Sequence, residues 1–512
     1  MYRIHEIKLG TGESKSAIPG KIRKKLNVEV LDYKIVKESI DARDKSDIKY
    51  IYTVDFKVAV EFEGVLSEAG IEKVSDTSYE YPPRFMGTLR TRPVIAGFGP
   101  CGMFAALLLS ESGYAPIVLE RGKPVNEREK DIKLLWNEDT LNEESNVQFG
   151  EGGAGTFSDG KLTTGIKDGR IRKVLEELVN AGAGEDILYK QKPHIGTDVL
   201  KKVVKSIREK IISNGGEILF ETRLEDVVIK DNKLIGVKVC DKEGQREISA
   251  EHLIVATGHS ARDTVRALHD AGILMEQKPF SIGIRIEHFQ KLIDESQYGK
   301  NADKRLPPAE YKLSHRCENG RGVYTFCMCP GGEVIMAASH TGGIVTNGMS
   351  NSARSGKFAN SAVLVDVRTS DFNSDDPLAG LLFQEKYEKI AFENAGKRYK
   401  ALQTTWAEFE NGSPSALPVI ESLPDFAISG IKEAIPKFAR KIKNFDDPTA
   451  KIYAVESRSS SPVRITRDEN FQSNIAGIYP GGEGAGYSGG IMSSAVDGIK
   501  IAEEIVKKLL SE

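Results

Sequence analysis

Residues 94–121 read VIAGFGPCGMFAALLLSESGYAPIVLER, and this stretch decides the fold. An apolar strand, Val94–Ala96, runs into a glycine-rich turn and then directly into an apolar helix that begins at Met103. A strand, a G-x-G-x-x-G turn and a helix in this order are typical of a Rossmann-type unit that binds a dinucleotide. The alternative is an accidental glycine turn. The three glycines of the pattern are Gly97, Gly99 and Gly102.

Each part of this turn has a predicted role in holding a diphosphate. Gly97 permits the tight turn, and Gly99 lets the backbone approach a pyrophosphate without a Cβ in the way. Gly102 lets the helix lie close to the sheet. Because the free N–H groups at the helix start attract phosphate, we expect the diphosphate along Gly97–Met103, including Pro100.

The second strand of this unit, Ile117–Leu119, ends in an acidic residue. Glu120 lies 23 residues after Gly97, the range at which a carboxylate accepts hydrogen bonds from an adenosine ribose. We therefore predict that Glu120, with Arg121 beside it, binds the adenosine end of the dinucleotide. The alternative for Glu120 is an ordinary carboxylate at a surface strand end.

Composition indicates a globular chain of several domains. It has 512 residues, of which 40% are hydrophobic, 28% are charged and 49 are glycine. Lys and Arg total 71 against 74 Asp and Glu, and this near-balance argues against a nucleic-acid binder. The first twenty residues lack an apolar signal region, and no run approaches the ~18 apolar residues of a membrane span. Five cysteines, few and odd in number, suit a reducing compartment, so we expect a cytoplasmic protein.

Four blocks of the sequence resemble those of a poorly characterised bacterial family of FAD-utilising, or NAD(FAD)-dependent, dehydrogenases. The resemblance covers about residues 90–512. It implies a single Rossmann domain that binds FAD non-covalently and carries an inserted substrate domain. The four blocks are GFGPCGMFAA (97–106), FGEGGAGTFSDGKL (149–162), LIVATGHSARD (253–263) and GIYPGGEGAGYSGGIMSSAVDG (477–498).

The last block predicts the flavin end of the site. A strand end runs into a glycine turn that contains Gly482 and Glu483, and a second pair, Gly489 and Gly490, precedes a helix that begins at Ile491. Glu483 is placed to hold a ribityl hydroxyl, although family members often carry Asp at this position. The N–H groups around Gly490 and the positive helix end favour the flavin N1–C2=O edge, where the reduced ring is anionic.

The resemblance implies further cofactor contacts. The turn Ala256-Thr257-Gly258 would pass under the diphosphate and ribose, although by pattern alone it is a generic strand end. Leu224 would present its backbone to the adenine. The loop with Gly152 and Gly153 would pass near the flavin, with a flexible surface loop as the alternative. Arg128 is expected to pair with the diphosphate, or else to lie on a solvated helix face.

Two side chains are candidates for the chemistry itself. Lys161, at the end of the glycine-rich loop, would steer an anion or relay a proton if it faces the flavin or the substrate. Arg285 lies on a predicted strand, Ser281–His288, on the face opposite the isoleucines. From there it would bind a substrate carboxylate. An ordinary surface lysine and an exposed cross-strand ion pair are the respective alternatives.

Histidines and cysteines near residue 320 invite a metal interpretation, which we do not favour. The C-x-C and H-x-C pairs lack the spacing of a zinc knuckle, and Tyr324–Met328 has the pattern of a core strand. Buried structural cysteines are the preferred interpretation, a redox dithiol comes second, and no metal is predicted. The residues concerned are His315, Cys317, Cys327, Cys329 and His340.

The predicted fold class is α/β. It combines a three-layer Rossmann-like FAD-binding domain, an inserted mixed α+β substrate domain and a small N-terminal αβ module. The predicted boundaries are 1–88 for the module, 92–275 and 456–512 for the two parts of the FAD-binding domain, and 276–455 for the insert.

The predicted function is an FAD-dependent oxidoreductase that transfers hydride between an unidentified small-molecule substrate and flavin N5. Because no second strand–GxGxxG–helix unit is present, NAD(P)H would act only as a transient electron donor. A flavin monooxygenase or oxidase on the same fold is a competing hypothesis. Two more distant hypotheses are a flavin-bound sensor or RNA-associated factor acting through residues 1–88, and an enzyme that modifies a macromolecule.

Overall fold

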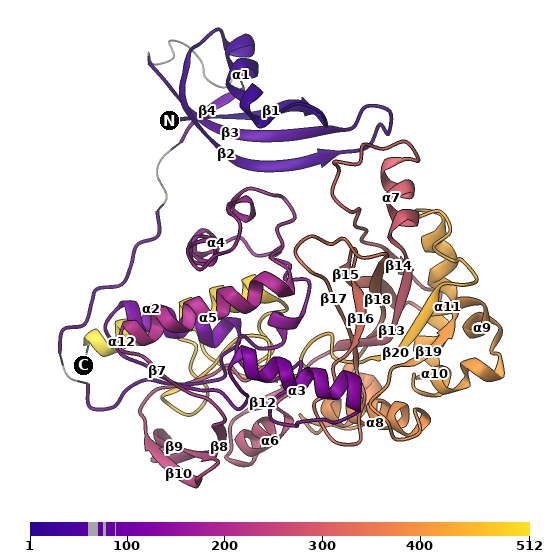
Figure 1. Cartoon of the computed structure of the whole chain (residues 1–512). Coiled ribbons are helices and arrows are strands. Elements are labelled where there is room, and N and C mark those ends of the chain that lie inside the picture. Colours follow the sequence, from indigo (N-terminus) through magenta and orange to yellow (C-terminus); the bar gives the residue numbers. More distant parts are fainter. Residues whose placement is uncertain (60–69, 75–77, 88, 512) are drawn as a thin grey trace.

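The computed structural model describes residues 1–59, 70–74, 78–87 and 89–511. Figure 1 shows a small sheet at the N-terminus, a helix-covered parallel sheet and a larger antiparallel sheet with its own helices. Among the described residues, no helix combines the length and the apolar character that crossing a bilayer requires.

The parallel sheet is built around residues 94–121. Its strand order is β22-β11-β5-β6-β7, and every neighbouring pair is parallel. The helix after β5 packs with two others on one face, where they lie side by side in Figure 1. The elements are β5 (Val94–Ala96), β6 (Ile117–Leu119), β7 (Glu217–Leu219), β11 (Leu253–Val255), β22 (Ile478–Pro480), α2 (Pro100–Glu111), α5 (Thr197–Ser213) and α12 (Ile491–Ser511).

Alternating side chains give this sheet two buried faces, as expected of a three-layer domain. Ile95 and Val118 pack under the helices, whereas Val94 and Leu119 pack on the opposite side against a small antiparallel sheet. That sheet has the order β10-β9-β8 and consists of β8 (Arg223–Lys230), β9 (Lys233–Asp241) and β10 (Gly244–Ser249). The strand that precedes this small sheet, β7, pairs in parallel with β6 and so belongs to the parallel sheet.

The second large sheet is antiparallel, with the order β14-β15-β18-β13-β20-β19. The predicted insert, residues 276–455, contains this sheet except for the last residue of β20. Several helices cover it and share its core. The strands are β13 (Phe280–Phe289), β14 (Ser314–Arg316), β15 (Gly322–Cys329), β18 (Phe358–Val367), β19 (Leu402–Thr405) and β20 (Lys451–Glu456); the helices are α7 (Gln290–Tyr298), α8 (Ala379–Asn394), α9 (Trp406–Asn411), α10 (Leu417–Glu421) and α11 (Asp425–Ala439).

Two short strand pairs connect these bodies. β12 pairs antiparallel with β21, so the segments that lead into and out of the large antiparallel sheet lie together. A hairpin of β16 and β17 projects beside β15. The bounds of these strands are β12 (Met275–Gln277), β21 (Val463–Ile465), β16 (Glu333–Met336) and β17 (Thr346–Met349). The parallel-sheet body also contains α3 (Val125–Glu138), α4 (Arg170–Asn180) and α6 (Arg262–Asp270).

The N-terminal module is a four-stranded antiparallel sheet, β2-β3-β1-β4, with one helix and a hydrophobic core of its own. Its elements are β1 (Tyr2–Gly10), α1 (Ile18–Leu26), β2 (Val30–Asp41), β3 (Lys49–Val58) and β4 (Ile71–Lys73). The predicted boundary at residue 88 lies outside the described residues. The segment just before it lies against the parallel-sheet body, because the Phe85 N–H donates to the Ser112 carbonyl at 2.8 Å.

Candidate active site

A cavity of ≈ 540 Å³ lies at the carboxyl edge of the parallel sheet, where ligands bind in open α/β sheets. The turns that follow β5, β6, β11 and β22 form one wall, and residues of the large antiparallel sheet and its hairpin form the other. Most of the predicted site residues line this cavity. They are Gly97, Gly99, Pro100, Glu120, Arg121, Gly153, Lys161, Leu224, Ala256, Thr257, Gly258, Gly482, Glu483, Gly489, Gly490 and Ile491.

Backbone contacts bring the two glycine-rich turns together at the cavity. Gly97 has φ +101°, and a Cβ there would collide with the carbonyl of Ala256. A Cβ on Gly482 would come within 2.8 Å of the Cβ of Cys101, in the first turn of α2. Glycine at these positions therefore lets three strand ends approach one another closely.

At other glycines on the cavity wall, no neighbouring protein atom explains why the residue lacks a side chain. A Cβ on Gly489 or Gly490 would meet nothing within 4 Å, and on Gly99 only the Cα of Gly153 at 3.8 Å. The φ of Gly99 is −78°, which any residue can adopt. Bare backbone on a cavity wall fits a ligand that lies flat against it, so these residues fit a dinucleotide.

Glu120 joins the first turn to the glycine-rich loop. One carboxylate oxygen accepts the N–H of Phe98 at 2.9 Å, and the other accepts the N–H groups of Gly122 and Gly150, each at 2.9 Å. The side chain is buried but still lines the cavity. A carboxylate has about four acceptor positions, so one remains for a ligand hydroxyl.

Arg128 has a different place from the one predicted. It is fully buried, does not line the cavity and donates hydrogen bonds to five carbonyl oxygens of the loop. The predictions that Arg128 pairs with the diphosphate or lies on a solvated helix face are therefore both wrong. Its guanidinium instead holds the glycine-rich loop in place. Burial lowers the pKa of Arg128 to about 10. The five carbonyls belong to Asn146, Val147, Gly150, Glu151 and Gly153.

Three further cofactor residues lie behind the wall rather than on it. A Cβ on Gly102 would collide with the carbonyl of Gly97, so Gly102 serves the close packing of α2 on the sheet. The Met103 N–H donates to the Gly99 carbonyl at 2.8 Å, which starts the helical hydrogen bonds. Gly152 has φ +81° and packs on Thr156. None of the three lines the cavity, so the predicted cofactor contact is wrong for Met103 and Gly152, whereas Gly102 has the packing role that the sequence predicted.

Arg285 is not a substrate ligand. It is fully buried and lies outside the cavity lining, with its Nε 3.1 Å from Glu456 Oε2 and its Nη1 2.9 Å from Asn360 Oδ1. The carboxylate and exposed ion-pair predictions are both wrong, because Glu456 and Asn360 of the flanking strands bind the guanidinium and Gly348 of β17 packs closely against it. Its partner Glu456 does line the cavity, and burial raises the pKa of that carboxyl.

Lys161 lies on the cavity wall, as expected of a residue that meets cofactor or substrate. Its Nζ contacts the Asp159 carboxylate and the carbonyl of Met328, which together use two of its three donors. Arg354 Nε also donates to Asp159, at 2.9 Å. The amine is therefore fixed in place and keeps one donor for a ligand.

Several further residues line the cavity, on both of its walls. His259 follows the predicted turn after β11, and its Nδ1 lies 3.3 Å from Glu483 Oε1. Arg458 is held by Glu388, with Nη2–Oε2 at 2.7 Å. The spacing gave no signal for the others, which are Tyr311, Phe326, Thr346 and Asn347.

The C-x-C pair also lies on this wall, but not as a regular strand. β15 has a bulge between Phe326 and Cys329, and Cys327 has φ +41°. Cys327 is exposed at the cavity, whereas Cys329 is buried and its thiol donates to the Cys327 carbonyl at 3.3 Å. The prediction of buried structural cysteines is therefore wrong for Cys327 and correct for Cys329.

Comparisons with known proteins identify relatives of the whole chain and of its parts. Residues 279–459 match the family "FAD-dependent protein, C-terminal domain-like", and residues 1–57 match a domain of unknown function, DUF8436. An uncharacterised protein of Clostridium beijerinckii is 45% identical over 99% of this chain and 98% of its own length. A thiamine thiazole synthase of Methanococcus vannielii is 25% identical over 35% of this chain and 59% of the synthase.

Solved flavoprotein structures show a more distant likeness. The flavin-dependent brominase Bmp2 is 12% identical, with a TM-score of 0.42 over 82% of this chain and 80% of that one. A glycine oxidase of Bacillus cereus is 11% identical, with a TM-score of 0.36 over 82% of this chain and 96% of the oxidase.

Proposed function

The chain belongs to the FAD-dependent protein family whose C-terminal domain it carries, and we propose that it is an oxidoreductase that moves hydride between a small-molecule substrate and the flavin. One observation carries the proposal. Two glycine-rich turns, one after β5 and one after β22, lie on the same cavity with bare backbone at Gly99, Gly489 and Gly490. A dinucleotide that reaches from one turn to the other accounts for both.

Different residues of the cavity wall would contact different parts of such a cofactor. Glu120 would take the ribose hydroxyls with its remaining acceptor position, and the start of α2 would take the diphosphate. Glu483, held near His259, would take a ribityl hydroxyl. The start of α12 at Ile491 would face the flavin N1–C2=O edge, where the positive helix end favours the anionic reduced ring.

When bound, FAD supplies N5 as the atom that accepts or gives up the hydride. The chain's own residues hold the substrate against it. Lys161, fixed by Asp159, is placed to bind an anionic substrate group or to hold a proton at its Nζ. Glu456, a buried carboxylate that pairs with Arg285, adds a fixed acceptor to the same wall.

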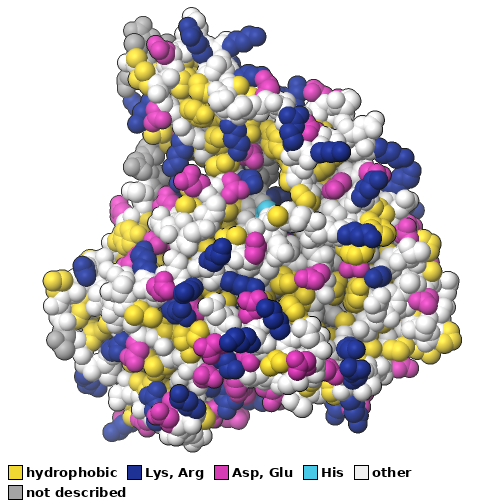
Figure 2. Space-filling view, in the orientation of Figure 1, with side chains coloured by type: hydrophobic (Ala, Val, Ile, Leu, Met, Phe, Trp, Pro, Cys, Tyr) yellow, Lys and Arg dark blue, Asp and Glu magenta, His cyan; other side chains and the backbone are white. Residues whose placement is uncertain are grey.

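The electron partner is a separate molecule under this proposal. Among the sheets that the described residues form, a single one is parallel, and its carboxyl edge already faces the cavity. NADH or NADPH would therefore visit the same cavity transiently, without a Rossmann unit of its own. We propose a cytoplasmic enzyme that acts on small molecules rather than nucleic acid. Figure 2 shows basic and acidic side chains interspersed over the visible face.

Anaerobic spectroscopy of the purified protein tests this function. We expect a flavin spectrum that NADH or NADPH bleaches, and that an oxidised small-molecule substrate restores. A reduced protein that reacts rapidly with air would instead favour the oxidase or monooxygenase class. Protein that takes up FAD but whose flavin no nicotinamide nucleotide and no substrate reduces would contradict a hydride-transfer role.

A further inference from the structure

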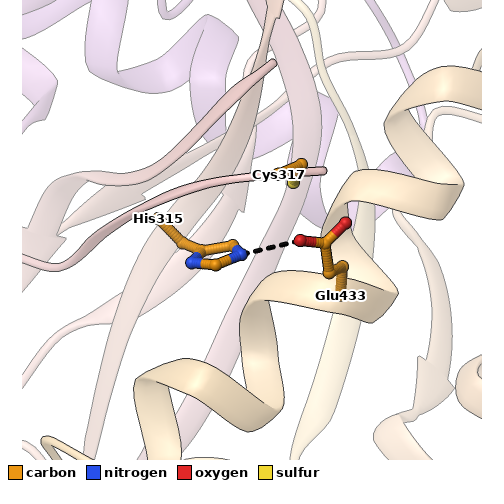
Figure 3. Close-up of side chains that lie close together, drawn as sticks. All are labelled: His315, Cys317 and Glu433. Carbon is orange, nitrogen blue, oxygen red and sulfur yellow. Dashed lines mark hydrogen bonds and ion pairs between the residues drawn. The ribbon is translucent and has the colours of Figure 1, made fainter. Parts of the chain in front are cut away.

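A second group of chemically active side chains lies away from the cavity, at the edge of the large antiparallel sheet. His315 is on the edge strand β14, Cys317 follows it, and Glu433 projects from α11 toward both (Figure 3). One potential ligand atom from each residue lies within 4.8 Å of the other two. None of the three residues lines the cavity, so this group is separate from the proposed flavin site.

The donor set indicates which ion would bind. An imidazole nitrogen, a thiol sulfur and a carboxylate oxygen together suit zinc, whereas magnesium and calcium prefer oxygen ligands alone. Zinc bonds of about 2.0–2.3 Å place tetrahedral donors roughly 3.3–3.7 Å apart. His315 Nε2 and Glu433 Oε1 are 2.8 Å apart, so the group needs only a small opening to admit the ion.

Neighbouring backbone holds two of the three side chains, Glu433 and Cys317, in place. The Glu318 N–H donates to both Glu433 oxygens, at 3.2 and 3.3 Å. A tight loop fixes Cys317, because its N–H donates to the Arg321 carbonyl at 2.8 Å and its carbonyl accepts the Gly320 N–H at 2.8 Å. The Cys317 thiol is buried and donates to the Gly430 carbonyl at 3.8 Å. Gly430 lies on α11, the helix that also carries Glu433.

From this geometry we propose that His315, Cys317 and Glu433 bind a zinc-class divalent cation. The three side chains occupy three tetrahedral positions, and water takes the fourth, since the His315 and Glu433 side chains are 23% and 29% exposed. Binding displaces the thiol proton to solvent. The ion then clamps the edge strand β14 to α11, a structural role that does not involve the flavin.

Zinc stoichiometry tests the proposal directly. The full-length protein, dialysed against Zn²⁺ and then against metal-free buffer, should retain one zinc per chain by elemental analysis and melt at a higher temperature than the EDTA-treated protein. Cys317→Ser, His315→Gln and Glu433→Gln should each weaken zinc binding at least tenfold. The matched control is His5→Gln, because His5 lies 3.4 Å from Glu72 in an exposed pair, and it should bind zinc like wild type.

Wild-type protein that retains no zinc, or three variants that all retain it like wild type, would overturn the site. X-ray absorption of the zinc-loaded wild type decides the matter even if a variant fails to fold. We expect one sulfur at about 2.3 Å with nitrogen and oxygen at about 2.0–2.2 Å. A shell without sulfur would show that the zinc lies elsewhere.

Discussion

Gly482 lies directly against Cys101, so closely that a Cβ on the glycine would come within 2.8 Å of the cysteine Cβ. Cys101 belongs to the first glycine-rich turn and Gly482 to the last one. Their contact shows that the ends of β5 and β22 form one continuous wall of the cavity. The proposed cofactor site depends on this convergence, which a substitution on the ligand-facing side of the wall can test.

Gly99→Val should abolish tight FAD binding while leaving the fold intact. A valine side chain would enter the space expected for the diphosphate, whereas the protein itself offers only one atom within 4 Å, the Gly153 Cα. We expect FAD affinity to fall at least tenfold in a fluorescence titration, with an unchanged far-ultraviolet circular dichroism spectrum. Gly20→Ala, at a position away from the cavity where a Cβ meets nothing within 4 Å, is the control. Equal affinity in wild type and Gly99→Val would remove the diphosphate assignment.

Arg285→Leu should destabilise the chain far more than the double variant Arg285→Leu/Glu456→Leu. Removing the guanidinium alone leaves a buried carboxylate without its partner, which costs about 3–5 kcal/mol. Replacing both groups removes that penalty. Urea unfolding of the two apoproteins measures the difference, and a double variant no more stable than the single one would speak against a buried pair.

Lys161→Met should leave FAD bound but slow the reductive step. The methionine keeps an unbranched side chain that is one heavy atom shorter, and it loses the amine that Asp159 holds on the cavity wall. We expect a flavin content close to that of wild type and a rate of flavin reduction by substrate at least tenfold lower. A variant of the exposed lysine at position 312, Lys312→Met, controls for charge at the same cavity. Unchanged reduction in Lys161→Met would exclude a catalytic role.

Acid should destabilise the chain through His252. Burial lowers the pKa of this histidine to about 4, so the unfolded chain binds its proton between pH 6.5 and 4 while the folded chain does not. The contribution of His252 to the free energy of unfolding is therefore fully present above pH 6.5 and is lost as the pH falls. Between pH 7 and pH 5 the free energy of unfolding should drop by about 2 kcal/mol. His252→Gln should flatten the pH dependence of the free energy of unfolding, and His5→Gln on the exposed surface should not. Parallel curves for wild type and His252→Gln would disprove the assignment.

The sequence predicted the parts of the site that local pattern determines. β5, the glycine turn and β6 lie where the alternation of strand, turn and helix placed them, because these elements are specified by neighbouring residues. Glu120 reaches the cavity for the same reason. The place of β7 in the parallel sheet could not be predicted in this way, because its pairing with β6 is not visible in its own three residues.

Local sequence pattern did not predict which groups the long side chains contact. The sequence showed that Arg128 and Arg285 lie on a helix and a strand, but not which groups would cover them. The carbonyls that surround Arg128 come from residues 146–153, and Glu456 lies 171 residues after Arg285. The same is true of Glu433, which lies 118 residues from His315 and completes a donor set that H-x-C spacing alone did not suggest.

A crystal structure of the chain with FAD tests the central claim most directly. We predict one FAD per chain, with its diphosphate at the start of α2 beside Gly99 and its isoalloxazine ring against Gly490 and Ile491. A flavin that touches one glycine-rich turn and leaves the other without ligand contact would contradict the account. Protein that remains colourless after incubation with FAD would contradict it as well.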